Sequence, residues 1–147
     1  MKKVAISACL LGKKCRYDGT DNRDETLLKN LEGMELIPFC PEDDAFGTPR
    51  PTMDLVQKND RIEAVSNATG KILSKPIREY AEAFFDNHRG IELFIGKDRS
   101  PSCGVCSARL YNEEKTLISD SEAGLMAKEA IKRGIIAVDA EKYEGEV

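Results

Sequence analysis

The sequence VAISACLLG at residues 4–12 begins with a short, β-branched apolar run and reaches a cysteine, Cys9, where that run ends. The same arrangement occurs twice more, because MELIPF at residues 34–39 precedes Cys40 and IELFI at residues 91–95 leads to SPSCG, which contains Cys103. Short apolar runs bounded by turn residues are typical of buried strands. The carboxyl ends of parallel strands meet at one edge of a sheet, so we expect the three thiols to share one site, which holds a metal centre.

Helix signals separate these runs. Asn22 with Glu25 three residues later predicts a first helix, and a second is predicted from about residue 74 to before Gly90. A possible capping box at Ser119 and Glu122 predicts a third helix. Each predicted helix leads into an apolar run, which is the order of elements in a parallel sheet with crossover helices.

The remaining segments predict turns, hairpins and a last strand. Residues 54–66 and 108–118 are interpreted as two hairpins, residues 135–138 as a final strand, and residues 40–51, with three prolines, as loop. The acidic tail from Glu141 is expected to fray. The whole pattern predicts one α/β domain over residues 1–147, three-layered, with a mainly parallel Rossmann-like sheet and one or two inserted β-hairpins.

The composition excludes several classes of protein. The chain has 147 residues, 33% of them charged and 41% apolar, which is ordinary for a globular domain. A net charge of −4 gives no electrostatic reason to bind nucleic acid or an anionic membrane. No apolar run approaches the roughly 20 residues of a membrane helix, and the N-terminal apolar run is too short for a signal peptide. We therefore expect a cytoplasmic protein with neither partner.

The five cysteines favour ligands or reactive groups over disulfides, because their number is odd and cytoplasmic thiols stay reduced. Three thiolates suit zinc with an open fourth position, or an iron–sulfur cluster with one iron not bound by protein. The single histidine, His88, is predicted at a helix end, away from the thiols. Cys103 and Cys106 could instead form a redox pair, but residues 107–111 read as strand, not as the helix that such a motif opens.

Four motifs, in order, resemble the thiouracil desulfurase family of bacteria: SACLLG with RYDG at residues 7–12 and 16–19, CPE at 40–42, TPRP at 48–51 and RSPSCG at 99–104. The resemblance extends over essentially the whole chain. It implies a cytoplasmic enzyme with a 4Fe–4S cluster held by three cysteines, whose free iron binds the sulfur of a thiolated pyrimidine such as 2-thiouracil. Water then replaces this sulfur, giving uracil and sulfide without net redox change.

Transferred to this sequence, the family's cluster ligands correspond to Cys9, Cys40 and Cys103, and its acid/base carboxylate corresponds to Glu42. An iron with an open position is a Lewis acid that polarises a carbon–sulfur bond. A carboxylate near it can take the proton of the attacking water.

The resemblance also implies that a serine beside the third ligand takes part in the reaction; we assign this role to Ser100, with Ser102 as the second candidate. We further expect Arg16, Tyr17 and Arg50 to bind the base by stacking and hydrogen bonds, although Arg16 and Tyr17 could equally anchor their own loop.

Some residues depart from the family's pattern. Cys15 and Cys106 lie where no family ligand is expected, and residues 43–46 are more acidic than the family's pattern.

Two other classes of function stay open. One is the same chemistry on another thiolated compound, and the other is a non-catalytic iron–sulfur or zinc protein that senses metal or redox state.

Overall fold

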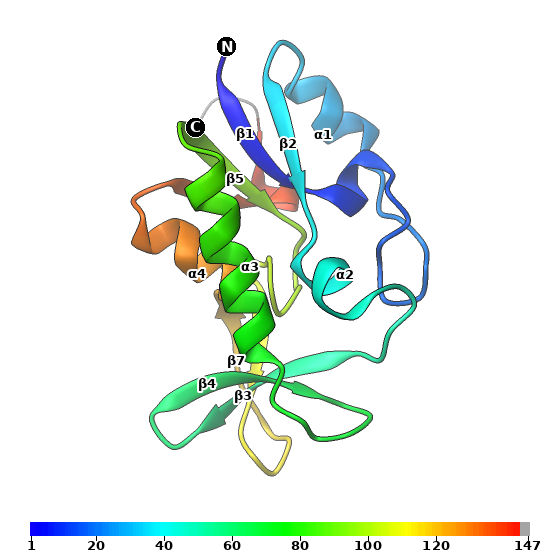
Figure 1. The fold of residues 1–147 in the computed structure, drawn as a ribbon, viewed down its shortest axis with the longest axis vertical. Coiled ribbons are helices and arrows are strands. Elements are labelled where there is room, and N and C mark those ends of the chain that lie inside the picture. Colours follow the sequence, from blue (N-terminus) through cyan, green and yellow to red (C-terminus); the bar gives the residue numbers. More distant parts are fainter. Residues whose placement is uncertain (145–147) are drawn as a thin grey trace.

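The computed structural model describes residues 1–144, which form two four-stranded sheets with helices packed against them (Figure 1). The first sheet is parallel throughout and has the order β2-β1-β5-β8. Its strands are β1 (Lys3–Ser7), β2 (Glu35–Phe39), β5 (Ile91–Gly96) and β8 (Ile136–Asp139). Each strand coincides with one of the apolar runs, so the expected α/β fold with a parallel sheet is confirmed.

The strand order makes β1 a topological switch point. The chain passes from β1 to β2 on one side of it and later returns to β5 on the other side. In open α/β sheets, ligands bind outside the carboxyl ends of the strands at such a point. The segments that follow β1, β2 and β5 are therefore the expected position of a site.

The parallel sheet is covered on both faces, which gives three layers. One face packs against α1 (Glu25–Asn30), and its core includes Val4, Ile6, Leu27, Leu31, Leu93 and Ile95. The other face packs against α3 (Ser74–Asn87) and α4 (Leu125–Lys132), and its core includes Ala5, Ala81, Phe84, Phe94 and Met126. Successive strand residues point to opposite faces, and in the two central strands, β1 and β5, nearly all of them are buried, which is why these strands read as almost unbroken apolar runs.

The two expected hairpins combine into a second sheet, with the order β4-β3-β6-β7. Its strands are β3 (Met53–Lys58), β4 (Arg61–Ser66), β6 (Ala108–Tyr111) and β7 (Leu117–Glu122), and β3 pairs with β6 in parallel. The core beneath it contains Leu55 and Leu110, together with Ile77 of α3 and Leu125 of α4. An isolated hairpin is only marginally stable, so pairing the two over the ends of α3 and α4 gives both a buried face.

The prediction that residues 40–51 are loop is wrong in its first half, because α2 (Pro41–Phe46) is helical. Pro41 is in the first turn, where the missing N–H would have no intrahelical partner. Three acidic residues follow in that turn, which is where the helix dipole favours negative charge. Cys40 is the N-cap of this helix and Glu42 lies in its first turn, so α2 holds both side chains in a fixed relation.

The predicted capping box at Ser119 and Glu122 is also wrong, since both residues belong to β7 and α4 begins only at Leu125. Ala108 of β6 pairs with Glu122, which extends the hairpin beyond the expected end. Gly124 is the N-cap of α4, and a Cβ added there would lie 2.5 Å from the Ser102 carbonyl carbon. Only glycine lets the start of this helix approach the segment that carries Cys103.

The tail does not fray where the sequence suggested. Ala140–Lys142 form a short helical turn, η2, and Tyr143 is buried in the core on the α1 face of the sheet. Residues 145–147, the end of the predicted tail, lie outside the described residues.

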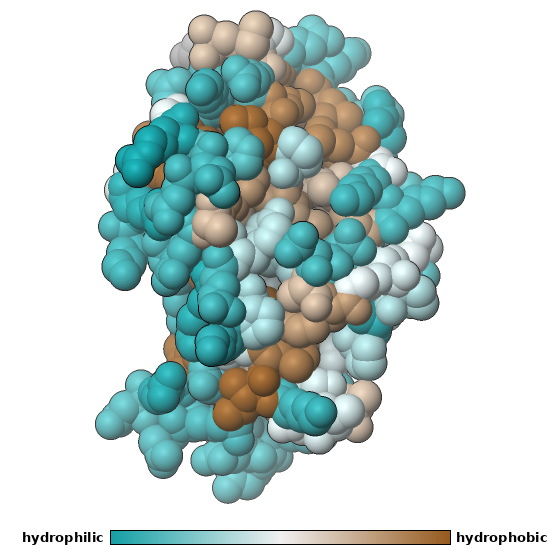
Figure 2. Space-filling view, in the orientation of Figure 1, coloured by the Kyte–Doolittle hydropathy of each residue, from teal (hydrophilic) through white to brown (hydrophobic). Residues whose placement is uncertain are grey.

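Hydrophilic side chains dominate the face shown in Figure 2, with narrower apolar bands between them. Among residues 1–144, the exposed large apolar or aromatic residues beyond the N-terminal methionine are Tyr17, Ile72, Leu117, Ile118, Ile131 and Ile136. Among residues 1–144, no helix combines the length and apolar character needed to cross a bilayer.

Candidate metal centre

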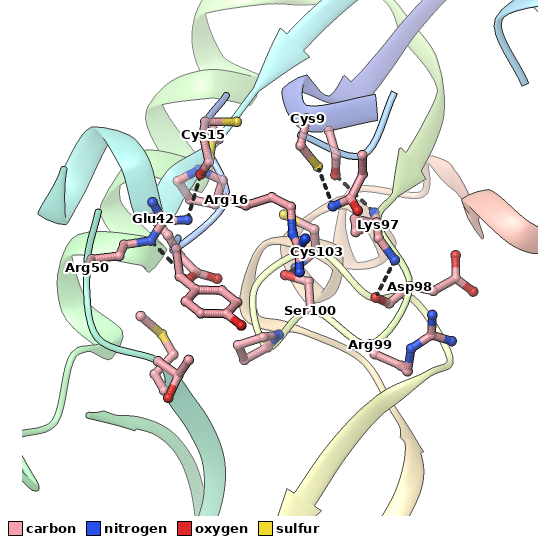
Figure 3. Close-up of a pocket in the computed structure, with 18 of the residues that line it drawn as sticks. Cys9, Cys15, Arg16, Glu42, Arg50, Lys97, Asp98, Arg99, Ser100 and Cys103 are labelled. Atoms are coloured by element: carbon pink, nitrogen blue, oxygen red, sulfur yellow. Dashed lines mark hydrogen bonds and ion pairs between the residues drawn. The ribbon is translucent and has the colours of Figure 1, made fainter. Parts of the chain in front are cut away.

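Cys9, Cys40 and Cys103 lie beyond the carboxyl ends of β1, β2 and β5, and together they line one cavity of about 680 Å³. Cys9 is on the short helical turn η1 (Ala8–Leu11), Cys40 caps α2, and Cys103 belongs to the loop 97–107 between β5 and β6. Figure 3 shows Cys9 and Cys103 facing the same space. The structure thus brings together the three thiols that the sequence separates by up to 94 positions, since all three follow strands around the switch point.

Cys9 is held by Asn22, which was expected from the sequence to cap the first helix. Asp24, not Asn22, caps α1, because its side chain accepts the Leu27 N–H at 3.0 Å. The backbone N–H of Asn22 donates to the Cys9 carbonyl at 2.9 Å, and its side-chain amide donates to the Cys9 sulfur at 3.6 Å. Asn22 therefore belongs to the wall of the cavity.

Cys40 is fixed by contacts on both sides. Its backbone N–H donates to the Tyr80 hydroxyl at 3.1 Å, and its thiol donates to the Cys15 carbonyl at 3.8 Å. The same carbonyl accepts a hydrogen bond from Arg50 Nη2 at 2.8 Å. Cys15 is buried and lines the cavity, so a fourth thiol lies beside the predicted three.

The position of Cys103 depends on a close approach between its backbone and that of Gly96. A Cβ on Gly96 would lie 1.7 Å from the Cys103 carbonyl oxygen, so only glycine fits at the end of β5. The Ser100 hydroxyl accepts the backbone N–H groups of Ser102 and Cys103 at 3.2 and 3.1 Å.

The buried Asp139 carboxylate at the end of β8 anchors the far side of the 97–107 loop. It accepts the N–H groups of Val105 and Cys106 at 2.8 and 2.9 Å and the Ser107 hydroxyl at 2.8 Å. The loop is therefore tied to the sheet at a point just beyond Cys103.

The thiols differ in their electrostatic surroundings. Burial raises the pKa of Cys9 and, more strongly, that of Cys103. A hydrogen bond from the Cys15 thiol lowers the pKa of Cys40, while the same hydrogen bond raises the pKa of Cys15. Because a thiolate is the form that binds metal, binding at this site releases protons, most readily from Cys40.

Glu42 is held by two groups. The hydroxyl of Ser102, which is fully buried, donates to Glu42 Oε2 at 2.8 Å. Arg50 Nε lies 3.5 Å from Glu42 Oε1, and this Nε has no hydrogen-bond partner among residues 1–144. The Arg50 side chain is only 6% exposed and that of Glu42 14%, so the pair is largely shielded from solvent. The carboxylate therefore has one fixed orientation at the cavity wall (Figure 3).

The two candidate serines have different positions. Ser100 lines the cavity, whereas Ser102 is not in its wall and reaches the site through Glu42. Arg16 and Tyr17 also line the cavity, with the guanidinium carbon 5.6 Å from the centre of the ring. Arg16 donates to Thr20 at 3.1 Å, so part of its charge serves its own loop.

All predicted site residues except Ser102 line this cavity. Sequence reasoning missed Asn22, Lys97 and Arg109, which line it too. Lys97 directly follows β5, so its place beyond a strand end was a usable signal. Arg109 lies on β6, and only the packing of the second sheet beside the first brings it here.

Comparison with known proteins decides the family. Residues 4–142 match the family described as 2-thiouracil desulfurase, which is nearly the full chain. The chain belongs to the 2-thiouracil desulfurase family. The uncharacterized protein YbbK of Bacillus subtilis (strain 168) is 29% identical in an alignment of 119 residues, and the alignment covers 74% of this chain and 76% of that protein. A solved structure of the 4Fe–4S-dependent thiouracil desulfidase TudS matches with a TM-score of 0.76 and 29% identity, covering 97% of this chain and 93% of that chain.

Membership in the 2-thiouracil desulfurase family confirms the resemblance carried by the four motifs, and the match to TudS agrees with the α/β fold. The donor set can be tested against the cluster that the resemblance implies. The five cysteines are free thiols, and thiolates are the soft ligands that iron–sulfur clusters use. Within residues 1–144, no three His, Cys, Asp or Glu side chains are grouped to hold a single metal ion. Three thiols around a wider cavity fit a cluster, whose irons are spread over several ångströms, better than one zinc ion.

Proposed function

We propose that the protein is a desulfidase that binds a 4Fe–4S cluster through Cys9, Cys40 and Cys103 and replaces the sulfur of a thiolated pyrimidine, such as 2-thiouracil, by oxygen. The observation that carries this proposal is the cavity itself, in which three thiols from three strand ends face one carboxylate, Glu42. The family membership and the described activity of TudS support the same reading. The proposal keeps the expected cytoplasmic location, where such thiols stay reduced.

The proposed reaction is a hydrolysis. One water and one thiocarbonyl give one carbonyl and one hydrogen sulfide, so no electron acceptor is needed. When bound, the cluster supplies an iron with an open position, a Lewis acid for the soft sulfur of the substrate. The residues of the chain then bind the ring, orient the water and move its protons.

Glu42 is proposed to be the general base that takes a proton from the attacking water. Its Oε2 already accepts the Ser102 hydroxyl, and its Oε1 faces Arg50, so the carboxylate is oriented before substrate arrives. A positioned carboxylate of this kind contributes roughly 100-fold or more to a rate. Ser102 is a positioning residue in this proposal, because it acts through Glu42.

Arg16, Tyr17, Arg50 and Ser100 are proposed to bind the ring. Tyr17 is 43% exposed and offers an aromatic face at the cavity, onto which a pyrimidine can stack. Arg50 lines the cavity beside Glu42, and its guanidinium supports a role as donor to a ring oxygen or nitrogen. Ser100 already uses its oxygen as an acceptor for two N–H groups, so its hydroxyl proton is free to reach into the cavity.

The test is anaerobic reconstitution with iron and sulfide, followed by a count of both per chain and a 2-thiouracil turnover assay that measures released sulfide. We expect about four irons per chain and turnover. Cluster binding without turnover on any thiolated pyrimidine would instead favour the sensing function.

The matched pair Cys40→Ser and Cys106→Ser separates ligands from bystanders. Cys106 is exposed and its thiol faces the Ser121 carbonyl at 3.7 Å. We expect the Cys40 variant to lose the cluster, because a hydroxyl is a poor ligand for iron. The Cys106 variant should retain wild-type iron content, and a full cluster in the Cys40 variant would contradict the ligand assignment.

A further inference from the structure

Lys97 is a residue of the cavity wall to which the reaction described above gives no role. It directly follows β5, and its backbone N–H donates to the buried Ser7 hydroxyl at 3.0 Å. Ile6 pairs with Ile95 in the parallel register of β1 and β5, so these two strands end side by side. Lys97 therefore leaves the sheet next to the segment that carries Cys9.

The ammonium group of Lys97 has unused hydrogen-bond donors. The residue is half-buried in the cavity wall. Among residues 1–144, its Nζ forms no ion pair, and its one hydrogen bond goes to the Asp98 backbone carbonyl at 3.3 Å. The Asp98 carboxylate instead accepts the backbone N–H of Glu141 at 2.9 Å. An ammonium has three N–H groups, so two of them remain for a ligand in the cavity.

The other cationic side chains of the wall are placed differently. Arg16, Arg50 and Arg99 each contact an acceptor side chain within their own part of the wall. Arg109 is exposed. Lys97 is thus a half-buried cation without an acceptor side chain, and taking an ammonium out of water is costly unless another acceptor replaces the water. This arrangement favours an anion in the cavity.

Glu42 and Lys97 lie on opposite sides of the site. Glu42 belongs to the helix that follows β2, whereas Lys97 follows β5, and these two strands flank β1. Figure 3 accordingly shows the two side chains on either side of Cys103. The proposed hydrolysis separates charge in the same way, because the attacking water loses a proton while the electron pair of the breaking carbon–sulfur bond passes to sulfur. A base on one side and a cation on the other match these two changes.

We propose that Lys97 is a catalytic residue that donates hydrogen bonds to the substrate sulfur and stabilises the negative charge that this sulfur gains as it leaves. The inference deepens the proposed function and rests on it. One water and one thiocarbonyl give one carbonyl, one hydrosulfide ion and one proton, and Glu42 takes this proton. Lys97 keeps its own proton, and no electrons are gained or lost. The same ammonium then binds the anionic product, hydrosulfide.

Lys97→Met removes the charge and keeps most of the length of the side chain. We expect kcat for 2-thiouracil to fall roughly 100-fold or more, the scale for losing a donor aimed at developing charge, with little change in KM. Iron content should equal that of the wild type, because the ammonium forms no hydrogen bond with a proposed ligand. Lys132→Met is the matched control, since it removes the same charge from an exposed position on α4 outside the cavity.

Binding of the product gives a second readout that needs no turnover. Sodium sulfide is titrated, without air, into cluster-loaded protein that holds no substrate, and the visible absorbance of the cluster reports binding. We expect the Kd for sulfide to rise about 10-fold or more in Lys97→Met, because a hydrogen bond from a charged donor is lost. The Lys132→Met protein should bind sulfide as the wild type does.

Two further variants separate the charge from a role in anchoring the loop. Lys97→Gln can still donate to the Asp98 carbonyl but carries no charge, whereas Lys97→Arg keeps the charge. We expect Lys97→Gln to be as slow as Lys97→Met, and Lys97→Arg to recover part of both kcat and sulfide affinity.

Three results would overturn the inference. A Lys97→Gln protein with wild-type kcat would show that the side chain only anchors its loop. A Lys97→Met protein whose iron content falls as far as its kcat would show that the residue retains the cluster. A rise in KM alone would show that Lys97 binds the ring without acting on the sulfur. A wild type that takes up no cluster would refute the proposed function, and this inference with it.

Discussion

Replacing Glu42 by glutamine separates the proposed chemistry from the stability of the site. The substitution removes the charge but keeps the shape, and the Ser102 hydroxyl can reverse its hydrogen bond to accept from the new amide. If Glu42 takes the proton of the attacking water, turnover should fall roughly 100-fold, which is about 2.7 kcal/mol of lost transition-state stabilisation. Cluster content and binding of thiouracil should persist, because neither depends on this proton.

The loss of stability that we expect for Glu42→Gln follows from the ion pair between Glu42 and Arg50. At a separation of 3.5 Å between Arg50 Nε and Glu42 Oε1, the Coulomb attraction is about 5 kcal/mol at an effective dielectric constant of about 20. Desolvation offsets part of it, and Arg50 keeps hydrogen bonds to Gly47, Thr48 and Cys15. We therefore expect a loss of about 3 kcal/mol, the low end for breaking a buried pair, or about 6–12 °C in Tm. Since domains are stable by about 5–15 kcal/mol, the variant should fold.

The assay measures sulfide release, iron content and Tm side by side, under anaerobic conditions, for the wild type and Glu42→Gln. Glu113→Gln is the control, because Glu113 forms an exposed ion pair with Lys58 at 3.3 Å, and such pairs contribute little. Wild-type turnover in a cluster-loaded Glu42→Gln protein would refute the assignment of Glu42 as the base. An unchanged Tm would refute the argument from the Arg50 pair.

Two other predictions concern the loop that carries Cys103. Gly96→Ala should lower Tm and iron content together, because its Cβ would lie 1.7 Å from the Cys103 carbonyl oxygen and the backbone must shift, at a cost of about 1–3 kcal/mol or more. Gly134→Ala, which meets no atom within 4 Å but has φ +78°, should lower Tm by the cost of that backbone conformation and leave iron content unchanged. Asp139→Asn should cost about 1–3 kcal/mol in denaturant unfolding, since an amide cannot accept all three of its hydrogen bonds; unchanged stability would show that the loop is anchored elsewhere.

The parallel sheet was predictable because its signal is local. Strands of a parallel sheet that is covered on both faces are apolar along most of their length, so residues 4–7, 36–39 and 93–96 stand out from a chain that is 33% charged. The cysteine after each run then places three thiols at one edge without further information. The four motifs carry the family resemblance for the same reason, since each is a short contiguous segment.

Two elements were wrong because their local signals allow more than one structure. A proline in the interior of a helix breaks the helix, whereas a proline in the first turn is well tolerated. Pro41 lies in the first turn of α2. Ser119 and Glu122 have the spacing of a capping box, yet both residues lie in β7, because this segment pairs with β6 as a strand. In both cases the outcome depends on neighbours that are distant in the sequence.

The sequence by itself determined the fold class, the family and the three thiols, because each rests on residues that are adjacent or regularly spaced. Only the tertiary structure decided how the site is finished: that Ser102 reaches Glu42 across 60 positions, that Arg50 faces the same carboxylate, and that Asn22 contacts sulfur instead of capping a helix. Hydrogen-bond partners of this kind are set by strand order and by the loops that follow each strand. A single side chain carries no signal of which distant donor the folded chain will place beside it.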